Sequence, residues 1–283
     1  MRIATTRYPL EIFASYDQAY EKLKINCMNA KDADVILFPE YAGLEWVWGY
    51  KKSFYENVHH FQKHGLAAYK DALLELACIC NITIIGGSVP VYDDGYYFNR
   101  CYIAHPTRKL LWQNKVNLTP SEKSLGWLNG GDTIKIFQSD FGSFSVCICY
   151  DSEFPEIVSH AVFNGADVVL IPSYTDSEHG AYRVQIAARA RAMENQCFAV
   201  TATCTGKVDC DEFDGSATGD PGIFTPIDSG FPIDGILEKS RESDIISANL
   251  DVSTMKRIRS EGQVHNFCDR INFKTINIEK ESL

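Results

Sequence analysis

The chain has 283 residues, 45% of them hydrophobic and 23% charged, which is typical of a globular protein with one large core or two smaller domains. A formal net charge of −10 at pH 7, without a basic cluster, argues against binding to nucleic acid or to an anionic membrane surface. No apolar run approaches the ~20 residues that a membrane-spanning helix needs, and the first residues lack the pattern of a secretory signal.

The predicted elements alternate between short apolar runs and longer amphipathic stretches. In the first half, strands are predicted at 2–5, 34–38, 82–85, 97–104 and 109–115, and helices at 17–30 and 54–80. Gly86 and Gly87 are expected to close the third of these strands. In the second half, strands are predicted at 143–149, 166–171, 197–203, 222–225 and 245–250, and helices at 155–164 and 182–195.

Two segments, 32–40 and 165–173, resemble each other, because each has a short apolar strand that ends at a proline. Strands that are apolar on both faces are typical of a sheet covered on both sides. This pattern predicts a layered α/β sandwich with two similar halves. No linker separates the halves, so we expect a single domain over 1–271 and a polar C-terminal tail over 272–283.

Ten cysteines are spread along the chain and form no dense framework. In a chain of this length the spacing indicates reduced thiols, so we expect a cytoplasmic protein. The close pairs Cys78/Cys80 and Cys147/Cys149 have one intervening residue and lie in apolar segments, unlike the Cys-x-x-Cys pairs of zinc sites. We therefore expect neither a metal nor another cofactor.

Three predicted strands end at a residue that can take part in chemistry: Glu40, Lys115 and Cys149. Functional groups of α/β sheets gather beyond the carboxyl ends of strands. Taken singly, each has an ordinary interpretation as a surface carboxylate, a solvated lysine or a buried core thiol. Together they predict a nucleophilic thiol, a base that takes its proton and a cation that holds the oxyanion formed when sulfur adds to a carbonyl carbon.

Three segments around these residues read, in chain order, ILFPEYAG, WQNKVNLTPSE and CICYDSEFPE. In this order and at this spacing they resemble the Glu, Lys and Cys signatures of the nitrilase superfamily, the carbon–nitrogen hydrolases. Gly165–Asp167 and Ala190–Asn195 resemble the family as well, and the similarity thins after Thr225.

The resemblance implies a role for each of four residues. Glu40 is implied as the general base, Lys115 as the group that stabilises the intermediate, and Cys149 as the nucleophile. Glu122 is implied as a second glutamate that positions the substrate and orients Lys115. The resemblance also implies a four-layer αββα sandwich and a homodimer formed through the nucleophile-bearing region, or a higher homo-oligomer.

The residues after Cys149 bear on the reaction. Nitrile-hydrolysing relatives follow the nucleophile with Trp-Glu, whereas Tyr150 and Asp151 follow it here. The resemblance therefore implies hydrolysis of a small linear amide or an N-carbamoyl amine through an acyl-cysteine intermediate, with release of ammonia or an amine. Two alternatives stay open: a nitrilase, and an interaction module that kept the fold and lost the activity.

Three further residues are expected to contact the substrate or its oxyanion: Tyr150 through its backbone N–H, Glu153 and Ser173. Relatives that bind a substrate carboxylate place an arginine soon after the nucleophile, so Glu153 favours a neutral or cationic amide. The alternative is that Glu153 caps the helix that follows it. His179 is a candidate partner of Cys149 in a Cys–His hydrolase, although its surroundings match no such signature.

Overall fold

The computed structural model describes residues 1–47, 53–210 and 213–271, so the predicted polar tail at 272–283 lies outside the described residues. The strands of the first half are β1 (Arg2–Pro9), β2 (Val35–Leu37), β3 (Thr83–Asp93), β4 (Tyr96–Ala104), β5 (Leu110–Asn114), β6 (Leu128–Asn129) and β7 (Ile136–Ser139). The helices of this half are α1 (Tyr16–Asn29), η1 (Ala42–Trp46, a 3₁₀-helix), α2 (Phe54–His64), α3 (Leu66–Cys80) and α4 (Pro120–Ser124).

The second half repeats the alternation of strands and helices. Its strands are β8 (Gly142–Val146), β9 (Val168–Ser173), β10 (Phe198–Cys210), β11 (Phe213–Ala217), β12 (Gly222–Phe224), β13 (Ile236–Lys239) and β14 (Ile245–Asn249). Its helices are η2 (Cys149–Glu153, a 3₁₀-helix), α5 (Pro155–Phe163), α6 (Glu178–Asn195), α7 (Val252–Glu261) and α8 (Asn266–Ile271).

Two sheets are joined where β1 meets β10. The central strand order is β5-β4-β3-β2-β1-β10-β9-β8-β7, in which β2 lies next to β1 and β9 lies next to β10. Residues 2–6 of β1 pair with β14, and its last residues pair in parallel with β10, from Arg7 opposite Thr203 to Pro9 opposite Thr205. The two segments that resemble each other in the sequence therefore end in strands that flank this junction.

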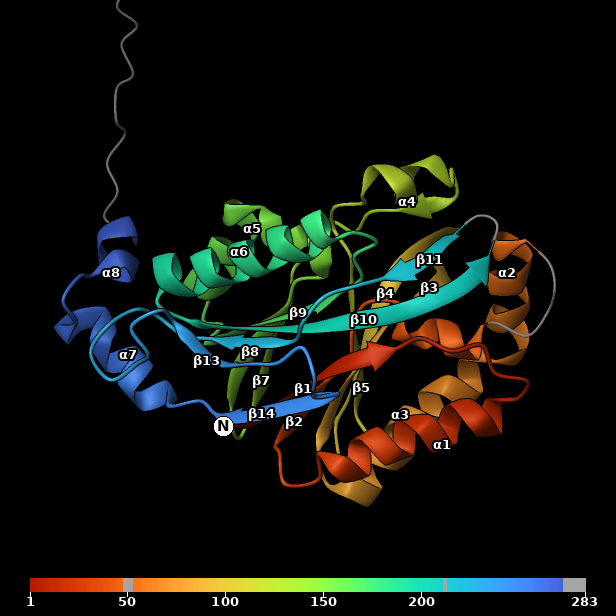
Figure 1. Ribbon diagram of the computed structural model, residues 1–283, viewed down its shortest axis with the longest axis horizontal. Coiled ribbons are helices and arrows are strands. Elements are labelled where there is room, and N and C mark those ends of the chain that lie inside the picture. The colour runs from red at the N-terminus through yellow and green to blue at the C-terminus, as the bar shows by residue number, and fades with distance from the viewer. Residues whose placement is uncertain (48–52, 211–212, 272–283) are drawn as a thin grey trace, which may run out of the picture.

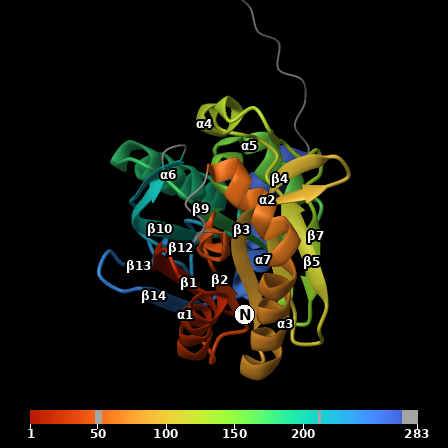
Figure 2. The ribbon, with the colours of Figure 1, turned by 90° about the vertical axis from the view of Figure 1, so that its right-hand side faces the viewer.

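The molecule has four layers (Figures 1 and 2). Helices α1 and α3 cover the outer face of one sheet, and α5 and α6 cover the outer face of the other. Strand β2 shows why its residues are apolar on both faces. Ile36 belongs to the core that includes Leu23 of α1, whereas Val35 and Leu37 share a core with Val169 of β9. This arrangement confirms the predicted α/β, four-layer αββα sandwich.

Glycines explain two differences from the predicted elements. The single helix expected over 54–80 is two helices that meet at Gly65, where a Cβ would lie 2.6 Å from both the Phe61 ring and the Tyr16 hydroxyl oxygen. Gly86 and Gly87 do not close a strand, because β3 continues to Asp93 with a register shift between Ile85 and Ser88.

The nucleophile candidate also lies differently from the prediction. The strand expected over 143–149 ends at Val146, and Cys149 is the first residue of η2. Its backbone has φ 47°, in the left-handed region that a side chain makes costly. Cys149 therefore stands at a sharp turn after the strand, not inside it.

Candidate active site

Glu40 lies three residues past the end of β2, in a turn that Gly87 permits. Gly87 has φ 76°, and a Cβ there would collide with the carbonyl oxygen of Pro39. Tyr41, also in the left-handed region at φ 63°, donates its backbone N–H to the Ser88 hydroxyl at 3.0 Å. The two contacts hold the segment that carries Glu40 against the bulged part of β3.

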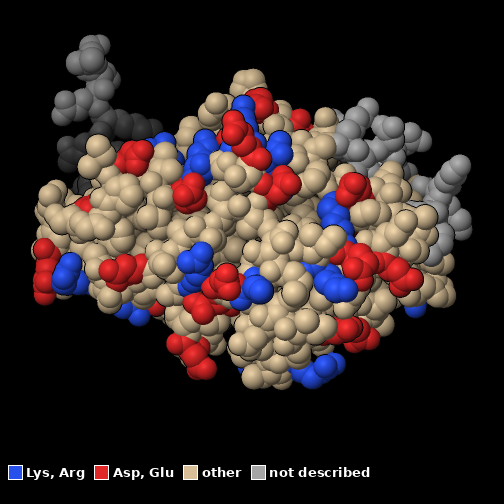
Figure 3. All heavy atoms as spheres, turned by 60° about the horizontal axis from the view of Figure 1, so that its bottom comes forward, with Lys and Arg blue, Asp and Glu red and all other residues tan. Residues whose placement is uncertain are grey.

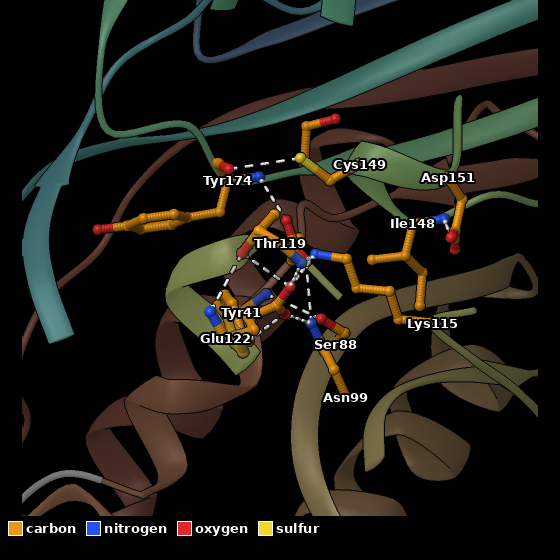
Figure 4. A network of polar contacts seen from close by, with 12 residues as sticks. Tyr41, Ser88, Asn99, Lys115, Thr119, Glu122, Ile148, Cys149, Asp151 and Tyr174 are labelled. Atoms are coloured by element: carbon orange, nitrogen blue, oxygen red, sulfur yellow. Dashed lines mark hydrogen bonds and ion pairs between the residues drawn. The ribbon is translucent and has the colours of Figure 1, made fainter. Parts of the chain in front are cut away.

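Lys115 lies between two buried carboxylates. Its Nζ donates to Glu40 Oε1 at 2.7 Å and to Glu122 Oε2 at 2.6 Å. The side chains of Lys115 and Glu40 are 1% and 2% exposed, so this ion pair is shielded from water. Asn99 connects the same carboxylates, since its Nδ2 donates to Glu40 at 2.9 Å and to Glu122 at 3.0 Å. Figure 4 shows Lys115, Glu122 and Asn99 converging beneath Cys149.

The Cys149 thiol faces Glu40 and the chain at Tyr174. Its Sγ donates to the Tyr174 carbonyl at 3.4 Å, and the Glu40 carboxylate is the charged neighbour that most raises the pKa of the thiol. The Tyr174 backbone N–H donates to Glu40 Oε2 at 3.0 Å, so Tyr174 contacts both groups. Sulfur, carboxylate and ammonium thus lie in one cluster, as the order of the three motifs predicts.

Asp151 ties the nucleophile turn to the segment after β5. Its buried carboxylate accepts the backbone N–H groups of Val116 at 3.1 Å and Asn117 at 2.7 Å, and that of Ile148 at 3.3 Å. Because these residues flank Lys115 and Cys149, Asp151 fixes the two functional segments relative to each other. Figure 4 shows it beside Ile148, on the far side of Lys115 from Tyr174.

The two glutamates have opposite pKa shifts. Burial raises the pKa of Glu40, against the opposing effect of Lys115. Burial also acts on Glu122, but Lys115, Tyr41 and Thr119 donate to its carboxylate and hold its pKa below the ordinary value. Burial raises the pKa of the Cys149 thiol, and the Glu40 charge adds to this effect. The hydrogen bonds of Glu122 therefore favour its ionised form, whereas burial favours the neutral form of Glu40.

These groups open onto a cavity of about 460 Å³. Its walls include Glu40, Lys115, Glu122 and Cys149, and most of the rest is aromatic, apolar or hydroxyl-bearing: Tyr41, Thr119, Pro120, Ser121, Leu125, Tyr150, Tyr174 and Thr175. The volume lies in the range of small-molecule sites. Cys149, the predicted nucleophile, is only 5% exposed, but it lines this cavity, so a ligand in the cavity can reach it.

The other predicted site residues differ in their surroundings. Tyr150 and Glu153 line the cavity. The N-cap position of α5 is Phe154 and has no side-chain cap, so the alternative that Glu153 caps this helix is wrong. Ser173 is buried and donates to the Ile171 carbonyl at 3.3 Å, and it is not among the described residues that line the cavity. The next residue, Tyr174, lines the cavity where Ser173 was expected to do so.

His179 is exposed on the first turn of α6 and is likewise absent from the described residues that line the cavity. The geometry therefore disfavours a Cys–His pair. Asn99, Tyr41 and Tyr174 contact the buried carboxylates and were not predicted. Asn99 offers one signal in the sequence, a polar residue within a predicted strand, but its partners lie 59 and 23 residues away.

The outer surface shows no gathering of one charge on the face drawn in Figure 3, where acidic and basic side chains are interspersed. Among the described residues, no helix is long and apolar enough to cross a bilayer. Charged side chains are concentrated in the buried cluster of Lys115, Glu40 and Glu122.

Solved structures share this fold. A CN-hydrolase superfamily protein from Xanthomonas campestris superposes with a TM-score of 0.75 at 17% identity, covering 99% of both chains. An amidase from Nesterenkonia sp. gives a TM-score of 0.72 at 21% identity, covering 92% of this chain and 94% of the amidase. At these identities the comparison supports the architecture.

Sequence comparison extends the similarity. A probable hydrolase, YhcX, from Bacillus subtilis is 28% identical over 280 residues, which cover 95% of this chain and 53% of that protein, so the chain spans about half of YhcX. A 2-oxoglutaramate amidase from the same organism is 27% identical over 231 residues, covering 81% of this chain and 83% of the amidase. The model of the carbon–nitrogen hydrolase family matches residues 7–259. The chain belongs to the carbon–nitrogen hydrolase family.

Proposed function

We propose that the protein hydrolyses the C–N bond of a small linear amide or N-carbamoyl amine through an acyl-cysteine intermediate on Cys149. The observation that carries the proposal is that the Cys149 thiol, the Glu40 carboxylate and the Lys115 ammonium lie together on the wall of one cavity. Tyr174 links two of them, because its carbonyl accepts the thiol S–H and its N–H donates to Glu40. The opposite directions of the two pKa shifts support Glu40 as the proton-transfer residue and Glu122 as the positioning one.

In the first half of the reaction, Glu40 accepts the thiol proton as Sγ attacks the carbonyl carbon. The carbonyl π electrons move to oxygen and form an oxyanion. Glu40 then returns the proton to the departing nitrogen, the C–N bond breaks, and ammonia or an amine leaves. The product on the enzyme is a thioester of Cys149.

In the second half, a water molecule enters the vacated position and gives a proton to Glu40 as it attacks the thioester carbon. The C–S bond then breaks, and the sulfur regains its proton from Glu40. The acid leaves, and the thiol and carboxylate return to their starting protonation states. One glutamate thus serves both halves, so no histidine is needed.

Two donors stabilise the oxyanion. Of the three N–H donors on Lys115, two go to Glu40 and Glu122, and the third remains for a substrate oxygen. The backbone N–H of Tyr150 follows the nucleophile, where η2 offers it no earlier carbonyl within the helix. Lys115 remains charged because Glu40 and Glu122 raise its pKa above the ordinary value, against the effect of burial.

Ammonia release tests the proposal. Cys149→Ala should abolish turnover across a panel of primary amides, N-carbamoyl amines and nitriles. Cys147→Ala is the matched control, because Cys147 is buried two residues away and does not line the described cavity. Equal turnover by Cys149→Ala and wild type would refute the mechanism. A panel in which only nitriles react would favour the nitrilase alternative, and no turnover with any class would favour a silent interaction module.

A further inference from the structure

A pair of opposite charges lies on the cavity wall beyond the buried cluster. Glu153 is the last residue of η2 and Cys149 is the first, and a 3₁₀-helix rises ~2.0 Å per residue, which separates their Cα atoms by about 8 Å along the helix axis. Arg183 reaches the same cavity from α6, and its Nε lies 3.4 Å from the Glu153 carboxylate. This pair therefore lies within the length of a small substrate from the nucleophile.

The backbone that carries Glu153 is held rigidly. The buried Arg191 donates its Nε to the Ser152 carbonyl at 3.0 Å and its Nη2 to the Glu153 carbonyl at 3.2 Å. The Glu153 side chain is only 21% exposed, whereas that of Arg183 is 61% exposed. A fixed carboxylate thus orients a more accessible guanidinium.

The guanidinium of Arg183 has unused donors. Its contact with Glu153 uses Nε, and within the described part of the chain neither of its Nη atoms has a protein acceptor. Two parallel N–H groups of this kind match a carboxylate.

This set of charges complements a ligand that carries both signs. A purely anionic amide would meet the Glu153 carboxylate and a purely cationic one the Arg183 guanidinium, so each would be repelled by one member of the pair. An ammonium on Glu153 and a carboxylate on Arg183 would satisfy both groups. We infer that the substrate is the side-chain amide of an α-amino acid, with its zwitterionic head group on Glu153 and Arg183.

The inference rests on the proposed function, because it requires the amide carbon to reach Cys149. It also changes the expectation from the sequence that Glu153 favours a neutral or cationic amide. That expectation considered Glu153 alone, whereas Arg183 lies 30 residues further along the chain and balances its charge. Tyr150, Tyr174 and Leu125 provide apolar surface for the methylene groups between head group and amide.

Four five-carbon primary amides test the effect of head-group charge on turnover: pentanamide (neutral), 5-aminopentanamide (cationic), glutaramate (anionic) and glutamine (zwitterionic). All four release ammonia, so one assay gives kcat/KM for each. Glutamine should be the best substrate, by about tenfold or more over each of the others, since a hydrogen bond to a charged group contributes ~1.5–3 kcal/mol and tenfold is ~1.4 kcal/mol. Any of the other three amides as the best substrate would overturn the inference.

Two variants assign the head-group contacts. Arg183→Gln should lower kcat/KM about tenfold for glutamine and glutaramate and leave pentanamide unchanged. Glu153→Gln should lower it for glutamine and 5-aminopentanamide and raise it for glutaramate. Arg189→Gln is the matched control, because Arg189 is exposed on α6, donates to the Asp234 carbonyl and does not line the described cavity. Equal effects of Arg183→Gln on all four amides would contradict a carboxylate contact.

The same samples separate the two proposals. If iodoacetamide labels Cys149 and some other amide is hydrolysed while glutamine is not, the head-group inference is wrong and the proposed function stands. If the thiol reacts but none of the four amides is hydrolysed, the inference is also wrong. If Cys149 is inert and no amide is hydrolysed, the proposed function itself fails.

Discussion

The two glutamates on Lys115 show how identical side chains acquire different chemistry from their hydrogen bonds. Glu122 accepts from Lys115, Tyr41, Asn99 and the Thr119 backbone, which together favour its ionised form. Glu40 accepts fewer donors and has the thiol as one of its neighbours. Removing Lys115 would leave both carboxylates buried without a counter-charge.

Lys115→Met should therefore abolish activity and lower the free energy of unfolding at pH 7 by about 3–5 kcal/mol, the usual cost of an uncompensated buried charge. The loss should shrink toward pH 4, where the carboxylates become protonated. Urea unfolding at both pH values measures this. The double variant Lys115→Met/Glu122→Gln should regain part of the stability and none of the activity. A single variant as stable as wild type would contradict the assignment of Lys115 as the counter-ion.

The pH dependence of activity follows from Glu40. Only its ionised form accepts the thiol proton, so kcat/KM should fall as the pH drops through its pKa. Because burial raises that pKa, the midpoint of this fall in kcat/KM, the acid limb of the pH profile, should lie above the ~4.3 of an ordinary glutamate. Asn99→Leu removes a donor to the ionised form and should move the limb to higher pH. An acid limb that is unchanged in Asn99→Leu would show that another group controls it.

At the scale of elements, the sequence identifies the residues that follow its apolar runs better than it predicts what surrounds them. Glu40, Lys115 and Cys149 were found because each follows an apolar run. Tyr174 was missed because its contact with Glu40 spans 134 residues, a distance that no local pattern encodes. Ser173 was predicted in its place because the strand reaches that residue, although its buried side chain donates to the Ile171 carbonyl of the same strand.

Gly87 was predicted only as the end of a strand, but it is needed for close approach of the segment that carries Glu40. Gly87→Ala should lower kcat strongly and reduce the melting temperature, because the new methyl group would displace the Pro39 carbonyl. Gly95→Ala is the control, since Gly95 also has positive φ (89°) but has no atom within 4 Å of the position that an alanine methyl group would take. It should lose ~1–2 kcal/mol of stability from backbone strain and keep its activity. Equal loss of activity in both would contradict a steric role for Gly87.

At the scale of the molecule, β1 and β10 connect the two sheets, and the active-site groups come from both. Glu40 and Lys115 follow strands of one sheet, whereas Cys149 and Tyr174 follow strands of the other. The strands that are apolar on both faces predicted a layered α/β sandwich, and the resemblance to the carbon–nitrogen hydrolases implied its four layers. The pairing of β1 with β10 was not predictable, because it joins residues about two hundred positions apart.

This connection supports the prediction that residues 1–271 form one domain. Unfolding followed by far-UV circular dichroism and by tryptophan fluorescence should give a single, coincident transition. Two separate transitions would indicate that the halves fold independently. The homodimer and the cytoplasmic location stay predictions, and light scattering against the chain mass of 31.8 kDa would test the former.

The central claim is that Glu40 and Lys115 make Cys149 the reactive thiol of this protein. Iodoacetamide labelling followed by peptide mass spectrometry measures it for each cysteine. The account predicts that Cys149 is labelled first, although Cys78 and Cys268 are more exposed, and that Glu40→Gln slows its labelling alone. Labelling that follows exposure, with Cys78 and Cys268 first and Cys149 unaffected by Glu40→Gln, would contradict it.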